Sequence, residues 1–298
     1  PDWSRGLGDV YKRQVFSLCC LVFFNSFLFG QDDWDFENTS NTDFFIDTRA
    51  VNGHTSEILE SNELEFRITH RFGEIATLES YRTLFGLDNS SDIRIALEYG
   101  LFKNMMIGMG RSKGAGPFLE VWDGLVKYKL YSSNKLSAAI HSTSLFTSMK
   151  RDTLPSSLIY FEKVAHRFNY NTSLIVAFKP IQNLSLQGTI GFLHQNKVHL
   201  DDQNSNLFLG ATSRYKLFKK ISLLVEYYHI LNPSNYRLDN YANPFGIGIE
   251  IKTYGHIFQL NLMNSRGIVE GQYMPFTRAK WSEGEFRFGF TIARKFEL

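Results

Sequence analysis

The sequence predicts an all-β protein whose strands close into an antiparallel transmembrane β-barrel of about twelve strands. Residues 284–297 show the pattern on which this prediction rests, because alternate positions are large and apolar, namely Phe286, Phe288, Phe290 and Ile292. A period of two places this row on one face of a strand and the intervening polar or small row on the other. An aromatic row opposite a charged row is typical of a strand between lipid and a polar lumen. We interpret this stretch as the closing strand of the barrel.

The first thirty residues are excluded from the fold. Residues 1–14 do not begin with Met and match nothing that follows, so we interpret them as an artefact of translation or assembly. Residues 15–30 hold an apolar run after two basic residues, which is typical of a signal peptide and too short for a comfortable membrane span. Both cysteines, Cys19 and Cys20, lie in this run. The exported chain is therefore expected to have no disulfide, thiolate nucleophile or cysteine-based metal site.

Residues 31–62 are predicted to form a periplasmic segment that contains a hairpin. The stretch begins acidic, and Asn52-Gly53 is a strong two-residue hairpin turn. The flanking residues are too polar for a lipid-facing wall. We expect the hairpin on the periplasmic side of the barrel or inside its lumen.

The barrel is predicted over residues 63–298 from twelve runs of alternating polarity. Most have roughly the 9–11 residues that a tilted strand needs to cross a bilayer. The runs are 63–71, 91–100, 104–111, 120–130, 136–149, 166–178, 184–195, 205–217, 221–231, 245–253, 256–264 and 284–297.

The connections between these runs give the strongest argument for a membrane barrel. Five short connections alternate with six longer ones, as short periplasmic turns and long external loops do in outer-membrane barrels. Every proline after Pro1 lies in a connection, where no ladder hydrogen bond is lost. A soluble β-sandwich or lipocalin-like barrel has the same period with its faces reversed. The alternating connections, the predicted export and the aromatic closing strand favour the membrane barrel.

Several stretches resemble an uncharacterised family of bacterial outer-membrane β-barrel proteins, a domain of unknown function in the Gram-negative envelope. The similarity runs from about residue 48 to the end and implies fold and location but no catalytic residues. The C-terminal strand also resembles the sequence read by the barrel-assembly machinery, although it ends in Leu298 rather than Phe. The stretches are Asn52-Gly53-His54, Leu64 to Gly73, Phe85 to Asn89, Ile93 to Gly100, Gly108 to Ser112, Trp122 to Lys129, Gly255 to Leu260, Asn264 to Gly267 and Gly284 to Phe296.

If the aromatic rows face lipid, the opposite rows face the lumen, and these carry charges of both signs on adjacent strands. The arrangement suits either a narrow hydrophilic channel or a lumen closed by ion pairs and side chains. A twelve-stranded bore lies between packed eight-stranded barrels and open porins, so both readings stand. The candidate lumen residues are Glu65, Arg67, Arg94, Glu98, Lys127, Arg214, Glu226, Glu250 and Arg287.

Basic and amide residues at the predicted upper ends of strands suggest an anion-attracting mouth. The first and eleventh strands both neighbour the twelfth in a closed barrel, so residues at their ends are expected close together. Contact with lipopolysaccharide phosphates, or plain solvation, is the alternative. The candidate rim residues are His70, Arg71, Arg111, Asn264 and Arg266.

The expected function is a narrow channel or transport barrel for small hydrophilic solutes in the outer membrane. The alternative is a non-conducting structural or docking barrel that binds a partner through its loops; a barrel-borne hydrolase is less favoured. The sequence holds no Gly-x-Ser-x-Gly elbow, and we expect no enzyme, no metal site and no cofactor. Net charge is only +2, so nucleic acid is not an expected partner. The expected partners are outer-membrane lipid, lipopolysaccharide and the barrel-assembly machinery.

Overall fold

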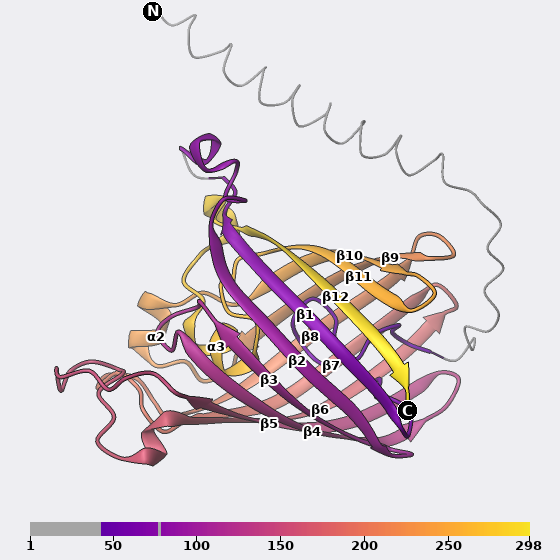
Figure 1. Cartoon of the computed structure of the whole chain (residues 1–298), viewed down its shortest axis with the longest axis horizontal. Helices are drawn as coiled ribbons and strands as arrows, with labels where there is room; N and C mark the ends of the chain where they lie inside the picture. Colours follow the sequence, from indigo (N-terminus) through magenta and orange to yellow (C-terminus); the bar gives the residue numbers. More distant parts are fainter. Residues whose placement is uncertain (1–42, 77–78) are drawn as a thin grey trace, which may run out of the picture. The chain divides into compact units, whose positions relative to one another are not determined.

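The computed structural model describes residues 43–76 and 79–298, and its twelve strands form one closed antiparallel barrel (Figure 1). The predicted artefact and signal peptide lie outside the described residues. The strands are β1 (Glu63–Glu74), β2 (Ser90–Phe102), β3 (Met105–Lys113), β4 (Glu120–Ser132), β5 (Leu136–Thr147), β6 (Phe168–Ile181), β7 (Leu184–Gln195), β8 (Ser205–Lys216), β9 (Ile221–Ile230), β10 (Phe245–Lys252), β11 (His256–Met263) and β12 (Arg287–Glu297).

Each strand pairs with its neighbours in the chain, and β1 closes the ring by pairing with β12. The closing register is long, running from Glu63 opposite Glu297 to Arg71 opposite Gly289. The prediction of twelve strands, including the closing role of the last one, is confirmed. Closure leaves no unpaired sheet edge, which is what a bilayer requires of a strand structure.

The two faces of the wall differ in polarity as the sequence predicted. On β6, Leu174, Val176 and Phe178 point outward and are 40–46% exposed. On the alternate row of the same strand, the polar residues Asn171 and Ser173 point inward and are buried. An apolar outer surface and a polar interior are the reverse of a soluble barrel, so the outer face is the one that meets lipid.

Connections at the two ends of the barrel differ in length. One end has turns of two to four residues, such as 182–183, and the other has the long connections. The short helices of the described residues lie in these long connections: η1 (Ser80–Thr83), η2 (Val164–Arg167), α2 (Asn235–Asn240), α3 (Glu270–Phe276) and η3 (Trp281–Glu283). None of the helices in residues 43–76 and 79–298 has the length and apolar character needed to cross a membrane.

Two segments enter the barrel and fill much of its interior: residues 43–62, which precede β1, and the connection 264–286, which contains α3. Apolar packing inside is broken into small clusters; one joins Tyr273 and Met274 of α3 to Phe208 and Tyr228 of the wall. Another joins Val51 to the wall. The interior is therefore a patchwork of apolar clusters within a polar lumen.

Candidate functional site: the occupied lumen

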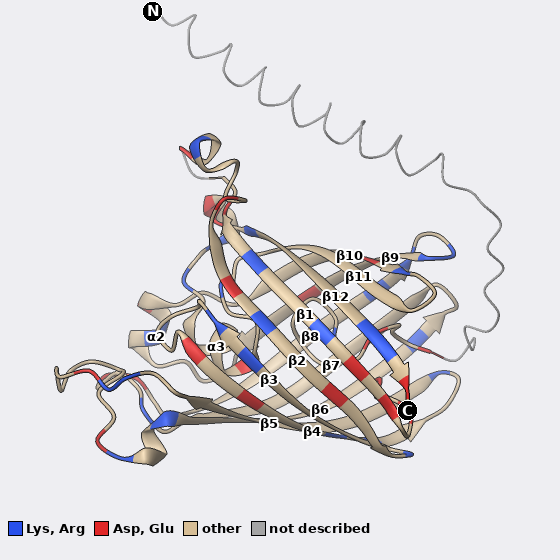
Figure 2. Cartoon of the chain, in the orientation of Figure 1, with Lys and Arg blue, Asp and Glu red and all other residues tan. Residues whose placement is uncertain are grey.

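The interior wall carries charged side chains of both signs. Figure 2 shows charged positions recurring along β1 and β2. All nine candidate lumen residues have buried side chains. They are Glu65 and Arg67 on β1, Arg94 and Glu98 on β2, Lys127 on β4, Arg214 on β8, Glu226 on β9, Glu250 on β10 and Arg287 on β12.

Residues 43–62, which we call the plug, lie inside the barrel with nearly every side chain from 44 to 56 buried. A hairpin forms here one residue earlier than predicted. The Ala50 N–H donates to the Gly53 carbonyl at 2.8 Å and Arg49 pairs with His54, so Val51 and Asn52, rather than Asn52 and Gly53, lie at its turn. A Cβ added at Gly53 would lie 1.6 Å from the Tyr228 hydroxyl oxygen. Only glycine allows the turn to approach the wall this closely.

Glu226 holds the tip of the hairpin. Its carboxylate accepts the Asn52 N–H at 3.1 and 3.3 Å and the Gly53 N–H at 2.9 Å. On the other side, Arg71 donates to the Asn52 side-chain oxygen at 2.7 Å. The turn has no other strand to pair with, so the wall satisfies its backbone donors.

A buried ion pair joins the plug to β1. The Arg67 guanidinium donates to both carboxylate oxygens of Asp47, through Nη1 at 2.8 Å and through Nη2 at closer range. It also donates to Glu65 beside it at 2.6 Å. Two-pronged pairing of this kind fixes orientation as well as distance. Asp47 is fully buried, and Arg67 is its ion-pair partner.

Further polar contacts run from the plug to β2 and β4. Lys127 donates to the carbonyl oxygens of Thr48, at 3.1 Å, and of Glu57. The Arg49 guanidinium lies 3.6 Å from the Glu98 carboxylate. Lys127 and Glu98 thus meet the plug directly.

Other candidate lumen residues pair within the wall. Arg94 donates to Asp123 at 2.6 and 3.0 Å, and Arg214 lies 3.1 Å from Glu250. Each of these ion pairs joins two residues of the wall.

The connection 264–286 closes the lumen from the side of the long loops. Gln272 on α3 donates to the backbone carbonyls of Ala115 and Phe118. Glu270 lies 3.5 Å from His54 and 3.6 Å from Arg49, so the loop meets the plug directly. Burial raises the pKa of Glu270, while burial and the neighbouring Arg49 lower the pKa of His54 well below its usual value.

His70, Arg71, Asn264 and Arg266 were predicted close together at one rim, but the structure does not place all four in one mouth. β1 continues to Glu74, so His70 and Arg71 lie within the strand and point to opposite faces. His70 stacks on Phe290 on the outer side, with ring centroids 5.6 Å apart, whereas Arg71 is fully buried against the plug. Arg111 lies over the outward-facing Trp122 ring at 5.0 Å.

Asn264 and Arg266 do share one cavity, of about 440 Å³, at the end with the long connections. Its other charged lining residues are Arg278, Arg287, Glu74 and Glu285. Arg287 of this group also pairs with Glu74. The predicted basic mouth is thus reduced to a cavity with three arginines and two glutamates.

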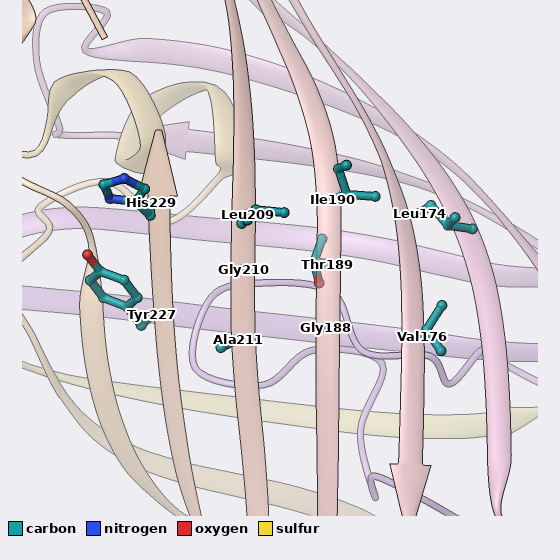
Figure 3. Close-up of a pocket in the computed structure, with 10 residues that line it drawn as sticks. All are labelled: Leu174, Val176, Gly188, Thr189, Ile190, Leu209, Gly210, Ala211, Tyr227 and His229. Atoms are coloured by element: carbon teal, nitrogen blue, oxygen red, sulfur yellow. The ribbon is translucent and has the colours of Figure 1, made fainter. Parts of the chain in front are cut away.

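A second hollow lies on the outer wall across β6 to β9 (Figure 3). The hollow forms because Gly188, which has no side chain, pairs with Ala211 across β7 and β8. Both lie between larger residues such as Ile190 and Leu209. The hollow faces the lipid side of the wall, so it is not part of a path through the lumen.

Several residues of the site were not predicted. Asp123 lies on the same inward row as Lys127, so the alternation in residues 120–130 already contained it. Asp47, Arg49 and Glu57 belong to the plug, where no strand period indicates which way a side chain points. Their partners depend on how the plug docks.

A closed antiparallel barrel with an apolar outer face defines an integral membrane β-barrel, and this architecture is that of outer membranes. The chain belongs to the family described as membrane-bound β-barrel domain (DUF5777), whose model matches residues 45–296. The predicted family, membrane barrel fold and outer-membrane location are confirmed.

Solved structures of similar fold include two porins and an outer membrane channel, all of low sequence identity. The KdgM porin is 8% identical, with 79% of this chain and 99% of that chain covered and a TM-score of 0.47. The NanC porin is 10% identical, with 79% and 100% covered and a TM-score of 0.45. The COG4313 outer membrane channel from Pseudomonas putida F1 is 14% identical, with 81% and 98% covered and a TM-score of 0.44. No curated protein sequence matches the chain significantly.

Proposed function

We propose that the protein is a transport barrel for small hydrophilic solutes, gated by its own plug, and that the structure represents its closed state. The observation that carries this proposal is the polarity of the wall beneath the plug. Glu65, Glu98, Lys127 and Glu226 would each be hydrated if the plug moved away. A permanently filled barrel has no need of such a wall, because apolar side chains fill an interior at lower desolvation cost.

The contacts that hold the plug are of a kind that water can replace. Most join a carboxylate, guanidinium, ammonium or amide to the plug, as at Glu226, Arg67 and Lys127. Each such contact contributes a modest net free energy, since water offers competing hydrogen bonds once the site opens. The plug is thus well oriented when docked and still able to leave.

The cavity beside Asn264 and Arg266 would form part of the entrance. Three arginines against two glutamates leave it weakly basic. We propose a weak preference for small anions, which reversal potentials in a salt gradient would measure. Lipopolysaccharide at the outer surface and the barrel-assembly machinery at the C-terminal strand remain proposed partners.

A disulfide between plug and wall tests the gating proposal. A Cβ built on Gly246 of β10 lies 3.5 Å from the Val51 Cβ, which is within the span of a disulfide. We therefore expect Val51→Cys/Gly246→Cys protein, oxidised, to show no conductance in planar bilayers. After reduction, the double variant should conduct as well as the Val51→Cys single variant, which serves as the matched control.

Deletion of residues 43–62 gives the complementary result. Liposomes containing the deleted barrel should swell rapidly in small sugars or amino acids, whereas those with the oxidised double variant should not. If the variant that lacks residues 43–62 keeps the gel mobility of folded protein but leaves liposomes impermeable, the proposal that the barrel transports solutes is refuted. That outcome would favour the non-conducting docking barrel, which the filling of the lumen by plug and loop also fits.

A further inference from the structure

Three metal-binding side chains from separate parts of the chain meet inside the lumen. His54 comes from the plug, His141 from β5 and Glu270 from the start of α3. One ligand atom from each lies within 4.8 Å of the other two. All three residues are buried, with 1%, 3% and 2% of their surface exposed. No strand pairing or helix period accounts for this meeting.

The polar atoms of these residues are poorly satisfied. Neither ring nitrogen of His54, neither carboxylate oxygen of Glu270 and not the Nδ1 atom of His141 has a hydrogen-bond partner. The closest charged contacts are Glu270 Oε1 to His54 Nε2 at 3.5 Å and to Arg49 Nη1 at 3.6 Å. Buried polar groups in folded proteins are nearly always hydrogen-bonded, so this cluster calls for a ligand that accepts several lone pairs.

We propose that His54, His141 and Glu270 form a binding site for a first-row divalent transition-metal ion such as Zn²⁺. Two imidazoles and one carboxylate are a donor set that zinc uses, with a fourth position left for water. Ligands of tetrahedral zinc at its usual bond lengths lie about 3.3 Å apart. The 3.5 Å between His54 and Glu270 already matches that spacing.

The surroundings suit a neutral imidazole at His54. Burial and nearby cations lower the pKa of His54, so its lone pair is available for a metal. His141 Nε2 lies 3.2 Å from the side-chain nitrogen of Asn171. Rotation of that amide by half a turn would present its oxygen to an Nε2–H, the usual partner of a metal-bound histidine.

Glu98 and Asp123 offset part of the positive charge around the cluster. Arg49, Arg94 and Lys127 act on His54, and the same three cations act together with Arg67 on Glu98. Asp123 acts on Glu270 and accepts two hydrogen bonds from Arg94. The Glu270 carboxylate adds a further negative charge as a ligand of the ion.

Metal binding at this site would join the plug, the wall and the α3 loop through one ion. The inference needs only the docked arrangement of these three parts, and it holds whether or not solutes pass through the barrel. It also revises the expectation from sequence, which predicted no metal site because the histidines are scattered along the chain.

The test is a zinc titration of the purified full chain in detergent, in competition with a chromophoric chelator. We expect one tight equivalent, with affinity falling on the order of 100-fold or more in His54→Ala and in Glu270→Gln. His194→Ala is the matched control, because His194 bonds to Ser205 and Asn196 elsewhere, and it should bind as the wild type does. Glu270→Gln keeps the side-chain size, and unchanged heat-dependent gel mobility will show that each variant is folded.

Cobalt gives a second readout that a loss of stability would not produce. The wild type with Co²⁺ should show the intense visible absorption of a four-coordinate site, and His141→Ala should lose it. Zinc affinity and cobalt spectra that stay unchanged in all three ligand variants would overturn the proposal, as would the absence of a tight equivalent in the wild type.

Discussion

Glu226→Gln should release the plug far more often than in the wild type. The Glu226 carboxylate accepts two backbone N–H groups of the hairpin turn, from Asn52 at 3.1 Å and from Gly53 at 2.9 Å. An amide keeps one acceptor and turns a donor toward the other N–H. The docked plug therefore loses one hydrogen bond to a charged group, which is worth up to about 3 kcal/mol. Since 1.4 kcal/mol is tenfold, the undocked population should rise on the order of 100-fold.

Labelling of a cysteine at Val51 measures that population. Val51 is buried against the wall when the plug is docked, so a bulky maleimide reacts only when the plug leaves. With Cys19 and Cys20 replaced by serine, the labelling rate in proteoliposomes should follow the undocked fraction while opening and closing are fast. The Glu226→Gln rate should exceed the wild-type rate by the same factor of about 100.

A matched control separates plug release from general loosening of the barrel. Glu250 is also a buried lumen glutamate, but its hydrogen bond goes to Arg214 on the wall. Glu250→Gln should therefore label at close to the wild-type rate. Equal rates for Glu226→Gln and Glu250→Gln would refute the reasoning that the hairpin tip is a specific anchor.

Three more predictions use the same labelling assay, one of them together with urea unfolding. Arg67→Ala leaves Asp47 buried without its partner, which costs about 3–5 kcal/mol, so Val51→Cys labelling should rise more than in Glu226→Gln. Lowering the pH below 6.5 with a metal chelator present should favour release, because His54 has a lowered pKa when docked and takes up a proton once undocked. Glu270, with its raised pKa, acts in the opposite direction, so the difference between wild type and His54→Gln isolates the histidine. Ile190→Lys on the lipid face should destabilise the barrel by about 2–4 kcal/mol in urea unfolding from lipid, without increasing labelling under native conditions.

The barrel was predictable because lipid acts on every strand in the same way. Each outward position must be apolar, so the period of two recurs twelve times and marks the strands within a few residues. The largest errors fall at the strand ends. β1 runs to Glu74 rather than 71, since its last residues still pair with Arg287 of β12. That extension moved His70 and Arg71 from the rim into the wall.

The rim cluster failed for a reason that pairing order cannot reveal. Neighbouring strands bring residues to the same height, but alternation decides whether a side chain points to lipid or lumen. His70 and Arg71 are adjacent in sequence and so face opposite sides, one against Phe290 and the other against Asn52. Strand alternation, applied to the predicted strand, would have placed His70 and Arg71 on opposite faces of the wall.

Whether the lumen is open was harder to predict, because water and a polar plug impose the same pattern on the wall. Glu226 suits both an open lumen and a filled one, since its carboxylate can accept hydrogen bonds from water or from the backbone of the hairpin tip. The distinguishing information lies in the plug itself. Phe44, Phe45 and Val51 are among the apolar residues of the plug, and each packs into a small buried cluster. Such residues in a segment before the first strand indicate docking inside a barrel, because exposure to the periplasm would leave them without apolar neighbours. A lumen that is polar on the wall and partly apolar on the plug gives a docked state that is specific yet reversible, which is the property that gating requires.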